Sequence, residues 1–282
     1  MKVSIITPVF DGDLVLRDAV ASMCAQTCAD WEWIIVNDGS TDGTKTFLDT
    51  LSDPRIVVVH QANAGVSAAR NAALDRARGD YVTFLDADDI LPPDALRVRS
   101  AVLDAQRGVD IVHGGVQVTS GGVPVRRSDP DLRPGPLLQR LARMEEGVFF
   151  SPNYMLRREK IGHHRFPVGV THCEDMIFFL TLANEADLQY AAVPEVVYEY
   201  QVQPQSAMTN LDGLERGYLE LVRRSADLHR IDAAARLVQY RRVRRILYRS
   251  WLRRLRPDRA LAALFKLHKA ASVSMRVGNR GS

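Results

Sequence analysis

The stretch DYVTFLDADDILPPDAL, residues 80–96, begins like a buried strand and ends in a concentration of negative charge. Four largely apolar residues, 82–85, are followed by three carboxylates within four positions, Asp86, Asp88 and Asp89. Carboxylates this close repel one another and raise one another's pKa unless a positive charge lies between them. The stretch therefore predicts either a solvated acidic turn or a cation site at the end of a strand.

Strand and helix patterns alternate through the first half of the chain. Apolar, β-branched runs predict four buried strands, at residues 3–7, 33–36, 55–60 and 81–85. Helices are expected at residues 14–26, 43–51, 65–77 and 94–106. Asp11 or Asp13 is the expected N-cap of the first helix. This alternation indicates crossover connections and an α/β fold with a mostly parallel, doubly wound sheet. Ligands of such sheets bind beyond the carboxyl ends of the strands, where the acids of the opening stretch lie.

The second half of the chain is less regular. Residues 110–125 predict two paired strands around a Gly-Gly turn. Two further short strands are expected, in LQYAAV (188–193) and in VVYEY (196–200). A helix at 171–184 begins with acidic residues, and from about Leu211 onward the whole pattern is helical.

Cysteine content and the N-terminal residues favour a cytoplasmic location. The three cysteines, Cys24, Cys28 and Cys173, form no disulfide framework and no metal-ligand set. Cys24 and Cys28 are four residues apart on an expected helix, so we expect buried, inert thiols, which suit a reducing compartment. Residues 1–13 contain no small-residue cleavage site, so we expect a first strand rather than a signal peptide. No apolar run approaches the ~18 residues of a membrane span.

The net charge of +3 is the sum of two unequal parts. Residues 241–282 contain thirteen Arg or Lys and one acid, whereas the first 240 residues contain twenty-four bases and thirty-three acids. The helix expected from residue 240 carries an apolar stripe on one face, formed by Tyr240, Val243, Leu247 and Trp251. Another face carries a stripe of arginines, Arg241, Arg245, Arg249 and Arg253. A second helix, opened by Pro257, adds Leu261, Leu264, Phe265, Lys266 and Lys269.

An apolar stripe beside a cationic face, without a membrane span, is typical of a helix that lies on a membrane. Each base near anionic lipid contributes ~1 kcal/mol. We therefore expect residues 240–282 to hold the protein peripherally at the inner face of the cytoplasmic membrane. The alternative is that these helices pack on the rest of the protein and leave their arginines in water. No nucleic-acid partner is expected, because the acidic first 240 residues would repel it.

The acids of the opening stretch match the ligand preference of hard divalent cations. Asp86 and Asp88 alternate after a strand end, and Mg²⁺ or Mn²⁺ is often bound by one or two carboxylates together with phosphate oxygens. On these residues alone, a solvated turn that caps the helix at 94–106 remains the alternative. The histidines show no metal-binding spacing, and we expect surface or turn positions for His113, His163, His164 and His172.

Four motifs that follow one another in order carry a family resemblance. They are TPVF (7–10), VNDGSTDGT (36–44), NAGVSAARNAAL (63–74) and FLDADD (84–89). Together they resemble the family 2 glycosyltransferases over roughly residues 1–200. The resemblance implies the GT-A fold, a Rossmann-like mixed sheet with flanking helices, in a catalytic domain at 1–210. Nucleotide-sugar binding is then expected in 1–110, the acceptor side in 111–210, and a basic helical extension in 211–282.

By this resemblance, Thr7, Pro8 and Val9 line the pocket for the nucleotide base, and Asp38 accepts a hydrogen bond from the uracil ring N–H. A carboxylate accepts hydrogen bonds without donating them, so it selects a base that offers a donor there. For Asp38, a structural role in the turn-rich segment NDGS is the alternative. Asn37 stands where many relatives carry an acid.

The resemblance assigns the phosphate side of the donor to Arg70 and the acidic turn. Arg70 lies in an Ala-rich helix and needs an anion, either a nucleotide diphosphate or Asp86, with a surface ion pair as the alternative. Asp86 and Ala87 would contact the ribose or the cation, and Asp88 would ligate Mn²⁺ or Mg²⁺ directly. Asp89 is expected to cap the next segment.

The motif HCEDM (172–176) resembles the acidic pair that the family places at a helix start on the acceptor side. Asp175 would be the general base that removes the proton of the acceptor hydroxyl, a role worth ~10²–10⁴-fold in rate. Glu174 would orient neighbouring groups. The alternative is that both acids merely favour a helix N-terminus.

Segment 201–209 resembles a loop that closes over the donor phosphates in this family. Gln201 and Gln203 stand where Arg and His are common, and Ser206 alone retains the pattern. That departure puts a phosphate contact from this segment in doubt.

These residues predict a transferase: metal-dependent, inverting transfer of a sugar from a nucleotide sugar, a UDP-sugar by resemblance, to an acceptor hydroxyl. The expected acceptor is a lipid-linked glycan or a membrane lipid in envelope glycan synthesis. A nicotinamide dehydrogenase would carry G-x-G-x-x-G after the first strand, where this chain has TPVFDGD. A sugar-nucleotide pyrophosphorylase would need a Gly-rich basic loop at the same place. A nucleotide-sugar binding or scaffold protein without transferase activity remains the alternative.

Overall fold

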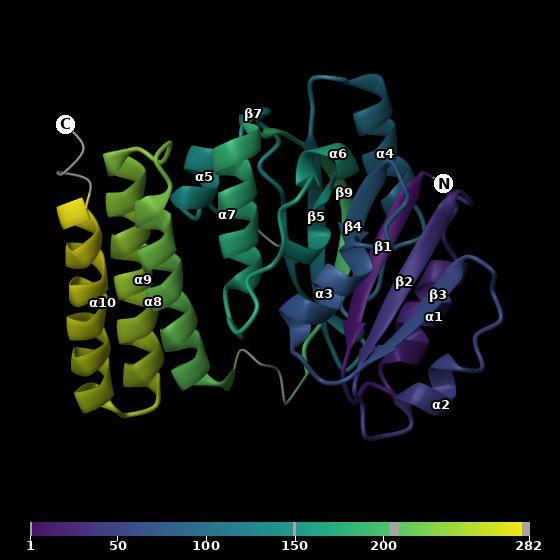
Figure 1. Cartoon of the computed structure of the whole chain (residues 1–282), viewed down its shortest axis with the longest axis horizontal. Helices are drawn as coiled ribbons and strands as arrows, with labels where there is room; N and C mark the ends of the chain where they lie inside the picture. Colours follow the sequence, from purple (N-terminus) through teal and green to yellow (C-terminus); the bar gives the residue numbers. More distant parts are fainter. Residues whose placement is uncertain (1, 149–150, 204–208, 278–282) are drawn as a thin grey trace. The chain divides into compact units, whose positions relative to one another are not determined.

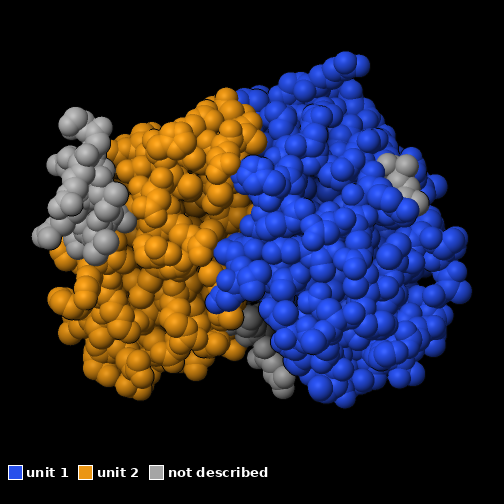
Figure 2. Space-filling view, in the orientation of Figure 1, with its two compact units in different colours: residues 1–135, 146–169, 188–204 blue, residues 136–145, 170–187, 205–282 orange. Residues whose placement is uncertain are grey.

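The computed structural model describes residues 2–148, 151–203 and 209–277. The chain forms two compact units, coloured separately in Figure 2. The first unit comprises residues 1–135, 146–169 and 188–204, and the second comprises residues 136–145, 170–187 and 205–282. The second unit thus combines the expected helical extension with two earlier segments of the chain.

One mixed sheet organises the first unit. Its strands, among the described residues, are β1 (Val3–Val9), β2 (Trp31–Asp38), β3 (Ile56–Gln61), β4 (Tyr81–Phe84), β5 (Ile111–Ser120), β6 (Val123–Ser128), β7 (Gly135–Pro136), β8 (Met155–Arg157) and β9 (Gln189–Gln201). They lie in the order β3-β2-β1-β4-β8-β5-β9-β7, and β6 pairs with β5 (Figure 1). The pairs β1–β2, β1–β4 and β2–β3 are parallel, as the alternation of strands and helices predicted. The sheet becomes mixed at β8, which is antiparallel to both of its neighbours.

The helices of the first unit are α1 (Leu16–Cys24), α2 (Thr44–Leu48), α3 (Val66–Leu74), α4 (Ala95–Ala105) and α6 (Arg158–Ile161), with a 3₁₀ turn at Ser151–Asn153. The apolar face of α1 packs into the core beside Trp31 and Trp33 of β2. Neither Asp11 nor Asp13 caps α1, contrary to expectation, because Val15 is the N-cap and makes no side-chain bond. Asp11 instead accepts a hydrogen bond from the backbone N–H of Thr41 at 2.6 Å, which ties the loop after β1 to the loop after β2.

The two short strands expected in LQYAAV and VVYEY are a single strand, β9. Its pairing with β5 shifts register on either side of Gly115, so that β9 has extra residues there, among them Pro194. Proline lacks the N–H that a regular ladder needs, and a bulge is where a strand accommodates it. Gly114 permits the close approach, since a Cβ there would lie 2.5 Å from Cγ2 of Val197.

Two expectations about side-chain environment are wrong. Cys24 is exposed, because the buried face of α1 passes through Leu16, Ala19 and Met23. Cys28 lies beyond the end of the helix and is partly buried against the core. His113 is buried inside β5 rather than at the surface, and burial, with a contribution from Arg99, lowers its pKa to about 3. Both errors arise because spacing along the chain does not show which neighbour covers a position.

The second unit is helical among the described residues. Its helices are α5 (Leu138–Ala142), α7 (Glu174–Ala186), α8 (Leu211–Asp227), α9 (Ala233–Arg253) and α10 (Pro257–Val277). α8, α9 and α10 run side by side (Figure 1) and share one apolar cluster. Glu215 of α8 is buried in this bundle, where it accepts hydrogen bonds from Trp251 Nε1 at 2.8 Å and Lys266 Nζ at 2.7 Å. One carboxylate therefore links three helices.

The apolar stripe expected to face a membrane is buried inside this bundle. Val243, Leu247 and Trp251 are 0%, 2% and 7% exposed, and they pack against residues of α8 and α10. The helical period was predicted correctly, but the partner of the stripe is protein. Within the described residues, no helix is long and apolar enough to cross a membrane.

Candidate active site

The acidic turn lies directly beyond the carboxyl end of β4, near the middle of the sheet. The backbone N–H of Asp89 donates to the carbonyl of Asp86 at 3.1 Å and closes the turn. Arg70 of α3 donates from Nη2 to Oδ1 of Asp86 at 3.0 Å, and its side chain is only 7% exposed. The structure thus places Arg70 against Asp86, one of the two anions expected for it.

The three carboxylates of the turn differ in their partners. Asp86 pairs with Arg70, whereas Asp89 is buried and accepts hydrogen bonds from the Tyr198 hydroxyl at 2.6 Å and the Gln201 N–H at 2.8 Å. Asp89 was expected to cap the next segment. Instead, it joins the turn to β9. Asp88 is half-buried and has no ion-pair partner within the part of the chain that the structure describes.

This arrangement concentrates uncompensated negative charge on Asp88. Burial, together with the charge of Asp86, raises the pKa of the Asp88 carboxyl to about 6. Burial and the charges of Asp86 and Asp88 raise the pKa of the Asp89 carboxyl, whereas the hydrogen bonds from Tyr198 and Gln201 oppose that rise. Two neighbouring carboxylates, one with a raised pKa, are a donor set that fits a hard divalent cation.

The residues expected to bind the nucleotide base lie at the carboxyl ends of β1 and β2. Thr7 is fully buried; its hydroxyl donates to the carbonyl of Leu85 at 2.7 Å and accepts from Trp33 Nε1 at 2.8 Å. Its side chain thus connects β1 with β2 and with the residue that follows β4. Val9 is buried in the core and Pro8 is half-buried.

Asp38 joins the end of β2 to the start of α3. Its carboxylate accepts hydrogen bonds from Gln61 Nε2 at 2.7 Å, Ala64 N–H at 2.9 Å and Gly65 N–H at 2.8 Å. Asp38 is 3% exposed, and these three bonds use most of the roughly four acceptor positions of a carboxylate. The adjacent Gly39 is required by its φ of 75° and by Asn63 N, which lies 2.6 Å from where a Cβ would be.

Glu174 and Asp175 occupy the first turn of α7 in the second unit, as expected. They follow Cys173, which has a left-handed φ of 60°. Burial and the charges of Asp175 and Glu174 raise the pKa of the Cys173 thiol. Burial, Cys173 and Asp175 likewise raise the pKa of Tyr218, which places this α8 tyrosine near the acidic pair. Ionisable neighbours are thus gathered around Asp175.

Several residues around these sites were missed from the sequence. Tyr198 and Tyr218 belong to apolar patterns that indicate only burial. The one available signal was the pair Gly213 and Gly217, spaced one turn apart on α8, which allows that helix to approach the backbone of His172. Ser206 of the expected phosphate loop lies outside the described residues.

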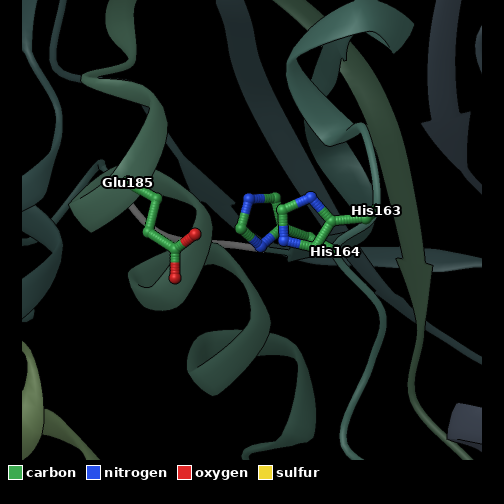
Figure 3. A group of neighbouring side chains, drawn as sticks. All are labelled: His163, His164 and Glu185. Carbon is green, nitrogen blue, oxygen red and sulfur yellow. The ribbon is translucent and has the colours of Figure 1, made fainter.

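The two neighbouring histidines do not form a metal site by themselves. His163 and His164 follow α6, and their rings stack with centroids 4.4 Å apart (Figure 3). Glu185, also drawn in Figure 3, belongs to the second unit. Among the described residues of the first unit, no third ligand joins the pair. A zinc site needs three or four protein ligands, so the acidic turn remains the better cation site.

A mixed α/β sheet with carboxylates just beyond a central strand defines the GT-A class of fold. Solved structures agree: S. aureus TarS 1-349 in complex with UDP-GlcNAc superposes with a TM-score of 0.66 at 16% identity, over 99% of this chain and 92% of that one. The mannosyltransferase PcManGT from Pyrobaculum calidifontis, in complex with GDP-Man and Mn²⁺, gives 0.61 at 20% identity, over 99% and 79%.

Sequence comparison identifies the family. Residues 4–165 match Glycosyl transferase family 2. The putative teichuronic acid biosynthesis glycosyltransferase TuaG of Bacillus subtilis is 30% identical, over 84% of this chain and 94% of its own length. The uncharacterized glycosyltransferase EpsJ of the same organism is 30% identical, and the matching region covers 72% of this chain and 62% of EpsJ. The chain belongs to glycosyl transferase family 2, and the expected family and fold are confirmed.

Proposed function

We propose that this chain transfers a sugar from a UDP-sugar to an acceptor hydroxyl, with inversion at the anomeric carbon. The observation that carries the proposal is the charge at the end of β4, where Asp88 has a pKa of about 6 and no ion-pair partner among the described residues. Nucleotide-sugar complexes of TarS and PcManGT support the class of donor. Asp38, an acceptor-only carboxylate at the end of β2, supports uracil.

Asp88 and Asp86 would hold Mn²⁺ or Mg²⁺. The bound cation would offset the charge that develops on the diphosphate leaving group. Arg70 orients the Asp86 carboxylate through their bond of 3.0 Å and adds a fixed positive charge at the phosphate side. Ala87, between the two carboxylates, leaves room for the ribose.

Asp175 would accept the proton of the acceptor hydroxyl as that oxygen attacks the anomeric carbon. A single displacement of this kind inverts the configuration, and the carboxyl proton is then lost to water. Glu174, which is 9% exposed, stays at the helix start to orient neighbouring groups. The relation to TuaG supports a glycan or lipid-linked glycan of envelope synthesis as the acceptor.

The test compares Asp88→Asn with Asp94→Asn. Asp94 is an exposed acid of the same stretch and pairs with Arg97 at the surface. We expect Asp88→Asn to weaken Mn²⁺-dependent UDP binding at least tenfold in calorimetry and to abolish transfer, because it removes a charged ligand. Asp94→Asn should retain both. Normal metal-dependent affinity and turnover in Asp88→Asn would show that the site is wrong, and donor binding by the wild type without transfer would favour a binding protein.

An anionic membrane surface at the inner face of the cytoplasmic membrane is the proposed partner of residues 240–282. Because the apolar stripe of α9 is buried, the contact would use exposed groups instead. Arg245 and Arg249 are exposed, and Leu255, Leu261 and Phe265 are 86%, 65% and 73% exposed. A segment with both exposed arginines and exposed apolar side chains is complementary to an interface of anionic lipid.

Vesicle sedimentation tests this partner with the full chain. Reversing two charges, Arg245→Glu with Arg249→Glu, should weaken binding to anionic vesicles at least tenfold, at ~1 kcal/mol per base. The matched control is Arg107→Glu with Arg126→Glu, which reverses two exposed charges of the first unit. Equal sedimentation of the two double variants would exclude the proposed surface.

A further inference from the structure

The acidic turn is attached to β9 by a buried network of hydrogen bonds. Ile90 and Glu199 exchange both backbone bonds, N–H to carbonyl, at 3.1 and 2.9 Å. The Tyr198 hydroxyl donates to Oδ2 of Asp89 at 2.6 Å and accepts from the backbone N–H of Asp86 at 3.2 Å. The Gln201 N–H donates to Oδ1 of Asp89 at 2.8 Å. A strand far away in sequence therefore holds both ends of a four-residue turn.

Burial makes this network rigid. Tyr198 is 0% exposed and Asp89 is 1% exposed. Both oxygens of Asp89 have donors from β9, so this carboxylate faces the interior of the sheet and is not one of the cation ligands. A buried, satisfied polar network specifies one geometry, because every displaced member leaves an unpaired group in a medium of low dielectric constant.

The hydroxyl of Tyr198 is the element that a phenylalanine could not replace. It serves at once as donor to a side chain and acceptor from the main chain of the first proposed ligand. Without it, the Asp86 N–H loses an acceptor and Asp89 loses its nearest donor. The direction of the Asp86 and Asp88 side chains depends on the main chain that these bonds fix.

We propose that Tyr198 and Asp89 are positioning residues, which hold Asp86 and Asp88 in the orientation that binds the divalent cation. The proposal rests on the function proposed above. Neither residue touches the donor; both act through the backbone of the turn. Because correct orientation of ligands within about 0.5 Å decides the affinity of such a site, their loss should appear in metal affinity before it appears in the fold.

The test compares Tyr198→Phe with Tyr190→Phe. Tyr190 is also on β9 and 0% exposed, but its hydroxyl donates to the carbonyl of Asp131 at 3.0 Å, away from the turn. Each variant deletes one buried hydroxyl from the same strand, so the two should lose similar thermal stability. Calorimetric titration of Mn²⁺ in saturating UDP should give about a tenfold weaker metal affinity for Tyr198→Phe, as expected for losing hydrogen bonds that orient the ligands. Tyr190→Phe should remain within about twofold of the wild type.

Asp89→Asn is the second variant, because it keeps an acceptor for the Gln201 N–H but not the carboxylate for Tyr198. It should weaken Mn²⁺ affinity while leaving uridine binding, which involves no phosphate, unchanged. Equal metal affinities of the Tyr198 and Tyr190 variants, with the wild type requiring Mn²⁺, would overturn the positioning role alone. A wild type that binds UDP equally well without metal would overturn the proposed function and this proposal together.

Discussion

Replacement of Gly217 by alanine should separate turnover from donor binding. Gly217 lies on α8, where that helix packs against the backbone of His172. His172 is two residues before Glu174, the first residue of α7. A Cβ at this position would lie 2.4 Å from the carbonyl oxygen of His172 and 2.7 Å from its Cβ. Ordinary contacts of this kind are about 3.5 Å, so the backbone of residues 172–173 must move by about 1 Å.

The expected effect on stability is small and the effect on turnover is large. Overpacking costs ~1–3 kcal/mol, and alanine returns ~1 kcal/mol because it favours the helix over glycine. A net loss of about 0–2 kcal/mol leaves the protein folded. A displacement of about 1 Å in a catalytic group can lower turnover ~100-fold. Asp175, the proposed base, is only three residues after His172, so the displacement should reach it.

Gly213→Ala is the matched control on the same helix. Its Cβ would lie 2.2 Å from Cε1 of the His172 ring. A ring can turn about its side-chain torsions, whereas a carbonyl cannot, so this variant should keep turnover within about tenfold of the wild type. Steady-state rates, thermal melting and UDP calorimetry measure the three quantities. Equal turnover of Gly217→Ala and Gly213→Ala would refute the reasoning. So would a loss of UDP affinity in Gly217→Ala that parallels its loss of turnover.

Three further outcomes are expected. Asp175→Asn should keep UDP affinity while transfer falls ~10²–10⁴-fold; loss of both in one variant would indicate a folding or donor-binding role. Mn²⁺-dependent UDP affinity should be constant above pH 7 and weaken about tenfold per pH unit below about 6. The reason is that the raised pKa of Asp88 leaves its carboxyl protonated, and so unable to ligate, as the pH falls. An affinity that stays constant down to about pH 4.5 would exclude Asp88 as a ligand. Glu215→Ala should lower the free energy of unfolding by ~1–3 kcal/mol, since the buried Trp251 N–H loses its acceptor; a change below ~0.5 kcal/mol in urea would contradict this.

The parts of the fold that depend on local patterns could be predicted from the sequence. The four parallel strands, the helices that connect them and the hairpin at Gly121 and Gly122 all follow from apolar spacing and turn chemistry within about a dozen residues. The order of the four motifs also indicates the family from the sequence alone. The position of each of these elements depends mainly on residues near one another in the chain.

The errors have a different cause: the sequence does not show which element packs against a given face. The period of α9 was predicted correctly, but Val243 and Leu247 pack on neighbouring helices rather than on lipid. Two short strands were expected at 188–193 and 196–200, yet a register shift against β5 keeps β9 continuous. Amphipathic spacing shows that a face is covered and does not identify what covers it. Each miss therefore concerns a contact between residues far apart in the chain.

The carboxylates of the opening stretch show why a site needs both kinds of information. In sequence, Asp86, Asp88 and Asp89 are equivalent acids. In the structure, Arg70 pairs with the first and β9 donates hydrogen bonds to the third, whereas no side chain among the described residues donates to Asp88. Distant residues thereby distinguish three acids that are equivalent in sequence: Asp86 and Asp88 stay as the proposed cation ligands, and Asp89 fixes the turn that carries them. A search for metal ligands in this family fold should accordingly rank acids by the partners they already have, since a satisfied carboxylate has less to gain from a cation.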